Sequence, residues 1–110
     1  MKPEITYEDF AKLDIRVGTV IAAESIQDAD KLIKCTVDFG ECGIRTIVSG
    51  IREWRSPESL VGKQLPYIIN LAPRTLRGVV SEGMLLAGQG QDGVALLIPD
   101  VEVAKGSRIK

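Results

Sequence analysis

The chain has 110 residues, of which 45% are hydrophobic and 26% charged, and its formal net charge is −1. This length and balance predict one folded domain over residues 1–110, rather than a disordered chain or a membrane span. The sequence contains no histidine, which removes the commonest acid–base group and argues against an enzyme. We therefore expect a binding module without catalytic residues.

The two cysteines, Cys35 and Cys42, lie in strand-like sequence. Without histidine, a zinc site there would need at least two carboxylate ligands, so no metal and no other cofactor is expected. The thiols are expected to stay reduced, as in the cytoplasm. The opening residues Met1–Glu4 lack an apolar signal core, which predicts a cytoplasmic protein with no membrane partner. No phosphate-cradling glycine-rich loop is present, and no small-molecule substrate is expected.

Charge is distributed unevenly along the chain. Residues 1–30 carry three basic and seven acidic side chains, whereas residues 31–78 carry eight basic and four acidic ones. This concentration of positive charge in the middle fits a localised anionic partner, although small domains also acquire such asymmetry by chance.

A short helix is predicted first, over Tyr7–Leu13, with Thr6 as its N-cap and Asp9 three residues on. Its apolar residues Phe10 and Leu13 are expected to anchor it on the core. Alternating apolar and polar residues then predict three strands, over Ile15–Glu24, Ile33–Phe39 and Arg45–Val48. Gly18, inside the first strand, indicates a bend or bulge.

The second half begins with an irregular stretch, residues 51–62, in which Pro57 follows Ser56 as in a capped helical turn. Trp54 lies in this stretch and either covers the core or stacks on a ligand. Two further strands are predicted over Leu65–Asn70 and Met84–Gln89, and an Asp92-Gly93 hairpin leads to Val94–Ile98.

Short strands at regular spacing, with one helical turn between the third and fourth, predict an all-β fold. We expect a five-stranded Greek-key barrel of the OB type, with short helices and with terminal extensions that form a dimer interface. An SH3-like barrel is the competing architecture.

The segment Asn70–Gly88 is the strongest candidate for a site. Arg74 and Arg77 lie in a stretch punctuated by proline and glycine. Guanidinium groups bind two phosphate oxygens at once, and Gly78 lets the backbone approach closely. Two solvated loop arginines would give the same pattern.

Ser81, Glu82 and Met84 follow directly. A hydroxyl, a carboxylate acceptor and a thioether are suited to bonding and packing against an unstacked base. A capped turn with Met84 in the core is the alternative. Asn70, at a strand end, is suited to donating and accepting hydrogen bonds, or to forming a turn.

Lys31 and Lys34 begin the second strand, which together with its neighbour lines the binding face of an OB barrel. They fit a nucleic-acid surface as well as a merely solvated one. Aromatic residues are few, so stacking along a single strand is not expected, and structured RNA fits better.

The sequence also resembles the tRNA-binding domain family, in six ordered motifs over nearly the whole chain. They are Phe10–Gly18, Ala29–Leu32, Val37–Gly40, Ile47–Ile51, Asn70–Arg74 and Leu76–Leu86. Members of this family end many bacterial methionyl-tRNA synthetases, occur in the endothelial-monocyte-activating-polypeptide group and exist as free-standing proteins.

The resemblance implies an OB-barrel homodimer that binds the outer corner of tRNA without reading the anticodon, alone or as an accessory to methionyl-tRNA synthetase. It implies RNA contacts at Lys31, Asn70, Arg74, Arg77, Ser81, Glu82 and Met84, with support from Lys34. An export-related chaperone subfamily shares the wording of Leu13–Val20 and implies an alternative, the binding of unfolded preproteins. The segments Ser49-Gly50 and Ser81–Met84 follow the tRNA-binding branch.

Overall fold

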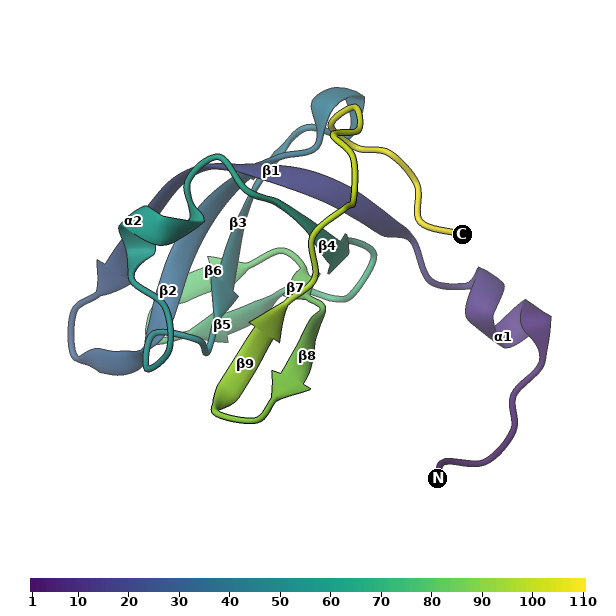
Figure 1. Ribbon diagram of the computed structural model, residues 1–110, viewed down its shortest axis with the longest axis horizontal. Coiled ribbons are helices and arrows are strands. Elements are labelled where there is room, and N and C mark those ends of the chain that lie inside the picture. The colour runs from purple at the N-terminus through teal and green to yellow at the C-terminus, as the bar shows by residue number, and fades with distance from the viewer.

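An antiparallel five-stranded sheet dominates the computed structural model, which describes residues 1–110 (Figure 1). Its strand order is β3-β2-β1-β4-β7, with β1 Ile15–Ile26, β2 Ala29–Asp38, β3 Ile44–Ser49, β4 Gln64–Ile68 and β7 Met84–Leu85. Two hairpins complete the strands: β5 Arg74–Leu76 with β6 Val79–Ser81, and β8 Ala87–Gly90 with β9 Gly93–Leu96. The helices are α1 Tyr7–Ala11, α2 Pro57–Leu60 and a 3-10 turn η1 Gly40–Cys42. The all-β prediction is confirmed.

The long strand β1 curves across the sheet, pairing with β4 at its start and with β2 over the rest. A shift of register between Val20 and Ala22 marks a bulge, three residues beyond the glycine that predicted it. Gly18 itself serves close packing, since a Cβ there would lie 2.4 Å from the Val37 side chain and 2.6 Å from that of Phe39. The absence of a side chain at Gly18 therefore lets Val37 and Phe39 pack directly against the backbone of β1.

The core lies on the concave side of this sheet. Eleven buried residues form one cluster: Val20, Ile33, Cys35, Val37, Phe39, Ile47, Ile51, Leu60, Leu65, Tyr67 and Ile69. The rings of Phe39 and Tyr67 meet edge to face at a centroid distance of 5.5 Å. Burial raises the pKa of the Cys35 thiol to about 11 and also raises the pKa of the Tyr67 hydroxyl.

No ladder of backbone hydrogen bonds joins the edge strands β3 and β7. Residues Ser81–Gly83 lie between them instead, and the amide of Glu82 donates to the carbonyl of Thr46 at 2.8 Å. The sheet is therefore bridged at this edge by a few specific contacts that come from the predicted site.

Residues 1–13, called the N-terminal arm here, project away from the sheet (Figure 1). The helix α1 ends at Ala11, two residues before the predicted end, but its capping box between Thr6 and Asp9 is present as expected. The prediction that Phe10 and Leu13 anchor the helix on the core is wrong: no residue of α1 is buried, and Phe10 and Leu13 are 36% and 41% exposed. No helix of the structure is long and apolar enough to cross a membrane.

The C-terminal tail returns along the start of β1. The amides of Val17 and Gly106 exchange hydrogen bonds with the carbonyls of Ser107 and Val17, at 2.9 and 2.8 Å. Lys105 forms an ion pair with Asp38 at 3.2 Å. The tail is thus fastened to the sheet both by its backbone and by charge.

Candidate nucleic-acid interface

The β5–β6 hairpin presents the two predicted arginines. Arg77 and Gly78 form its tip and both have positive φ, 50° and 81°, as a two-residue hairpin turn with strand-like twist requires. Arg74 and Arg77 are exposed, and neither takes part in an ion pair. Two guanidinium groups are therefore free to bind an anion.

A groove of about 370 Å³ lies beneath this hairpin. Its lining includes Leu71, Arg74, Ser81 and Met84, together with Val48 of β3. Leu71 and Met84 are 42% and 44% exposed, so the alternative that placed Met84 in the core is wrong. The groove combines a flat apolar lining with a cation at its rim.

Ser81 is a buried residue whose hydrogen bonds hold the wall of the groove in place. It is only 5% exposed, and its hydroxyl accepts a hydrogen bond from the amide of Val48 at 2.9 Å and donates to the carbonyl of Gly83 at 3.2 Å. Because its one proton is already donated, the hydroxyl fixes the hairpin against β3 and has acceptor capacity alone to offer a ligand.

Glu82 fastens the same edge. Its Oε1 accepts from the amide of Thr46 at 3.2 Å, while its own amide donates to the Thr46 carbonyl. The side chain is exposed, and no hydrogen bond within the chain uses its Oε2. One carboxylate oxygen therefore builds the fold and the other faces outward as an acceptor.

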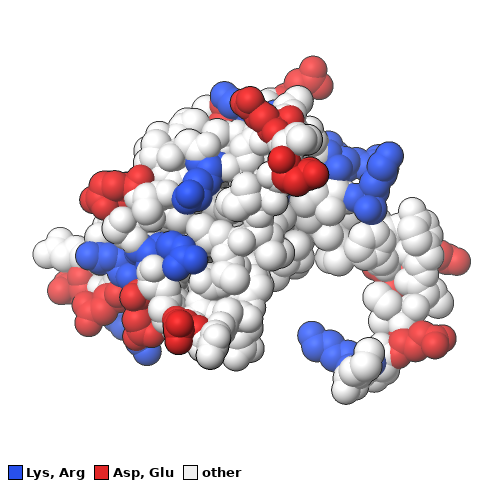
Figure 2. All heavy atoms as spheres, viewed as in Figure 1, with Lys and Arg blue, Asp and Glu red and all other residues white.

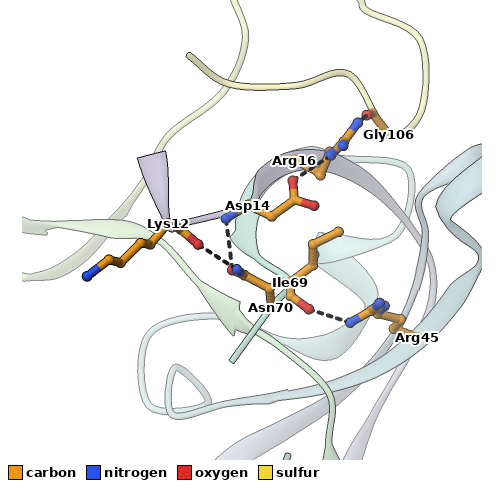
Figure 3. A network of polar contacts seen from close by, with 7 residues as sticks. All are labelled: Lys12, Asp14, Arg16, Arg45, Ile69, Asn70 and Gly106. Carbon is orange, nitrogen blue, oxygen red and sulfur yellow. Dashed lines mark hydrogen bonds and ion pairs between the residues drawn. The ribbon is translucent and has the colours of Figure 1, made fainter. Parts of the chain in front are cut away.

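Arg45 is a residue that the sequence did not single out. Its Nη1 donates to the carbonyl of Ile69 at 2.6 Å (Figure 3). It also donates to the carbonyl of Glu82 at 3.1 Å, so Arg45 joins residues on either side of the β5–β6 hairpin. Neither contact leaves a signal in the sequence, because Arg45 lies 24 and 37 positions from its partners.

Asn70 lies apart from the groove. Its Oδ1 accepts from the amide of Asp14 at 2.8 Å and its Nδ2 donates to the carbonyl of Lys12 at 2.6 Å (Figure 3). Asp14 in turn accepts from Arg16 Nε at 2.7 Å, a hydrogen bond that raises the pKa of the Arg16 guanidinium. The Asn70 amide is therefore occupied in joining the end of β4 to the N-terminal arm.

Lys31 and Lys34 lie on β2. Lys31 is exposed and unpaired, whereas Lys34 forms an ion pair with Glu24 of β1 at 3.4 Å. Lys34 is opposite Val48 in the β2–β3 register, so both lie on the outer face beside the groove. The carbonyl of Lys31 also accepts from the amide of Arg52 at 3.1 Å, which adds a basic residue that the sequence interpretation did not include.

The predicted site thus divides into three groups. Arg74, Ser81 and Met84 share one groove, with Arg77 at the hairpin tip and Glu82 at the β3 edge. The lysines lie on the neighbouring strand, and Asn70 lies at the arm. Across the face in Figure 2, basic and acidic groups lie next to one another at the periphery, around a largely uncharged middle.

A strand-dominated sheet that presents free arginines over a groove defines a small binding module. Residues 15–108 match the family described as "Putative tRNA binding domain". A methionine–tRNA ligase of Porphyromonas gingivalis strain W83 is 52% identical over 108 residues, which cover 97% of this chain and 16% of that protein. The chain therefore belongs to the tRNA-binding domain family, and it spans about one-sixth of the length of that relative.

Solved structures give the same result. A MetRS related protein from Pyrococcus horikoshii has a TM-score of 0.92 and 40% identity, covering 99% of this chain and all of that one. The chaperone CsaA from Bacillus anthracis has a TM-score of 0.89 and 34% identity, covering 98% of this chain and all of that one. The fold is thus shared by proteins described in two different functional terms.

Proposed function

We propose that this chain is a non-catalytic cytoplasmic module that binds the outer corner of tRNA as a homodimer, without reading the anticodon. The observation that carries the proposal is the β5–β6 hairpin, which holds Arg74 and Arg77 unpaired above the groove of Ser81 and Met84. Guanidinium groups bind phosphates with two hydrogen bonds each, and such contacts set register and orientation.

The remaining predicted residues support RNA binding in different ways. Met84 offers a soft apolar surface to an unstacked base, and the outward oxygen of Glu82 accepts from an exocyclic amino group. Lys31 and Lys34 add positive charge on the neighbouring strand. Asn70 contributes through its hydrogen bonds to the arm, and Ser81 by holding the hairpin.

The homodimer is proposed from apolar surface at the two ends of the chain. Large apolar side chains of the arm and of the tail are exposed, among them Ile5, Tyr7, Phe10, Leu13, Leu97, Ile98, Val101 and Ile109. An isolated five-residue helix is not stable in water, and α1 buries nothing on its own chain. A hollow of about 370 Å³ beside the tail, lined by Val17, Pro66 and Leu97 among others, offers a complementary surface.

A partnership with methionyl-tRNA synthetase is part of the proposal, because relatives with this segment bear that name. In such an arrangement the module would add affinity for tRNA without taking part in aminoacylation. Two basic hairpins held in one dimer would span a single folded RNA, which raises affinity by local concentration.

The deciding experiment compares tRNA binding by the wild type and by an Arg74→Glu/Arg77→Glu double variant. Each charge-assisted hydrogen bond contributes about 1.5–3 kcal/mol, so affinity should fall at least roughly 100-fold. Wild-type affinity should also fall with salt, with a log–log slope of roughly 0.7–0.9 per phosphate contacted. A Lys2→Glu/Lys63→Glu variant makes the same change in net charge elsewhere and should retain most of the affinity. Equal affinity of the two double variants would refute the site.

A second candidate, a chaperone for unfolded preproteins, is favoured by the exposed apolar surface and by the similarity to CsaA. It predicts that the dimer suppresses aggregation of a denatured client and that the Arg74→Glu/Arg77→Glu variant does so equally well. A lack of suppression at one dimer per client would remove this candidate.

A further inference from the structure

Trp54, the single tryptophan of the chain, lies in the loop between β3 and α2. It is 39% exposed and is not a member of the buried cluster. The loop is ordered by its backbone, since the amides of Trp54 and Arg55 both donate to the carbonyl of Ile51 at 3.0 Å. A large aromatic side chain is therefore held at the surface of a fixed turn.

The indole is packed against the turn of the β8–β9 hairpin. A Cβ on Gly93 would lie 2.2 Å from Trp54 Nε1, 2.3 Å from Cδ1 and 2.6 Å from Cε2. These three distances are nearly equal, which places that point above the five-membered ring and not at its edge. The glycine thus supports one face of the indole.

Arg55 locks this arrangement. Its Nη1 donates to the carbonyl of Trp54 at 2.9 Å and its Nη2 to the carbonyl of Val94 at 3.0 Å. The guanidinium therefore joins the Trp54 loop to the β8–β9 hairpin. The conformational entropy lost on binding at such a surface is small, because the ring is already oriented.

Beside the indole is an open hollow of about 410 Å³, lined by Trp54, Arg52, Arg55 and Ser25 together with the carboxylates Glu53 and Glu58. Arg52 forms no ion pair and no side-chain hydrogen bond. A free cation and an exposed aromatic face are thus adjacent, the combination that binds the phosphate and base of one nucleotide.

This hollow is linked to the candidate RNA surface through the end of β3. The groove of the β5–β6 hairpin reaches β3 at Val48, through the hydroxyl of Ser81. The chain leaves β3 at Ser49, and the amide of Arg52 then binds the carbonyl of Lys31 at the start of β2. The same end of β3 therefore connects the arginine hairpin, Lys31 and Trp54.

We propose that Trp54 is a stacking platform for an unpaired nucleobase of the bound RNA, with Arg52 on the neighbouring phosphate. This proposal rests on the function proposed above and assigns to that surface a second contact, outside the β5–β6 hairpin. The hollow is lined by two arginines and two carboxylates, and the neighbouring Lys31 is exposed and unpaired. The surroundings therefore carry a small excess of positive charge, which favours a polyanion over an apolar peptide.

The test uses the full chain and total tRNA, with two readouts in one titration: anisotropy of labelled tRNA for binding, and the emission of the only tryptophan for contact. Stacking predicts saturable quenching with the dissociation constant measured by anisotropy. Trp54→Leu should weaken binding roughly 5- to 150-fold, the range for loss of a stacked base. Trp54→Phe, which keeps a flat ring, should bind within about threefold of wild type. Circular dichroism and thermal melting would establish that both variants fold.

The other outcomes separate a failure of the Trp54 platform from a failure of the proposed function. If anisotropy reports binding while emission is unchanged, or if Trp54→Leu binds as well as wild type, the platform is refuted and the proposed function stands. If Trp54→Phe loses as much affinity for tRNA as Trp54→Leu, the indole has a purely structural role and the platform is again refuted. If no tRNA binds by either readout, the proposed function fails and the platform fails with it.

Discussion

The β5–β6 hairpin and the N-terminal arm are both appendages of one sheet, but they are attached in opposite ways. The hairpin is fastened to β3 by Ser81 and Glu82, and Arg45 of β3 binds the carbonyls of Ile69 and Glu82 on either side of it. The backbone that carries its arginines is therefore held without help from another molecule. The arm is held by the single side chain of Asn70 and leaves its apolar residues exposed. The polar surface is thus built within one chain, whereas the apolar surface of the arm is left uncovered by its own chain.

The largest effect is expected from Gly18→Ala, which disturbs the sheet that carries both appendages. The added Cβ would lie within 2.6 Å of Val37 and Phe39, and overpacking of this kind costs about 1–3 kcal/mol or more. Urea denaturation measures the loss. Gly50→Ala is the matched control, because the nearest atom to its Cβ is 4.0 Å away, and its free energy of unfolding should stay within about 0.5 kcal/mol.

Ser81→Ala should loosen the hairpin and leave the arm intact. The buried amide of Val48 loses its acceptor, which costs about 1–3 kcal/mol, and tRNA affinity should fall although no predicted phosphate contact is removed. Ser59→Ala deletes an exposed hydroxyl bonded to the Ser56 carbonyl and should cost less. An affinity for tRNA that is unchanged in Ser81→Ala would show that the hairpin needs no such fixing.

Asn70→Ala should affect the arm and leave the hairpin intact. Two hydrogen bonds at the base of the arm are lost, one to the carbonyl of Lys12 and one from the amide of Asp14. Each contributes about 1 kcal/mol, so the dimer dissociation constant should rise roughly 10-fold or more. Light scattering over a dilution series measures it, with the exposed amide variant Gln89→Ala as the control. A dimer unaffected by Asn70→Ala, with weaker tRNA binding, would return Asn70 to direct RNA contact.

The smallest effect concerns the tail, which is fastened by charge. The amide of Gly40 and the ammonium of Lys105 lower the pKa of Asp38 below its ordinary value of 3.8. A lowered pKa contributes stability above the ordinary value that is lost as pH falls through the lowered one. Asp38→Asn should therefore be slightly less stable than wild type at neutral pH, and the difference should vanish near the acid end of a urea series. Asp92→Asn, which removes an exposed carboxylate that forms no ion pair, is the control.

The sequence predicts the sheet well, because alternation over long strands such as β1 and β2 records which side chains are buried. It does not predict the β5–β6 hairpin, whose strands of three residues are too short to carry a periodic pattern. The roles of Asn70 and Ser81 were equally hidden, since their partners lie 56 to 58 and 33 positions away. The prediction that Phe10 and Leu13 pack on the core was wrong for a different reason. The sequence pattern of an apolar helical face is the same whether its own core or another surface covers it.

The contacts of Ser81 and Glu82 with β3 also protect this edge of the sheet from pairing with a strand of another molecule. An edge strand offers unpaired amides to which a strand of another molecule can add, and this is a route to aggregation. In β3 the outward amides of Thr46 and Val48 are capped by the side chains of Glu82 and Ser81. The residues that hold the hairpin in place therefore also keep this edge from acting as a template for another strand.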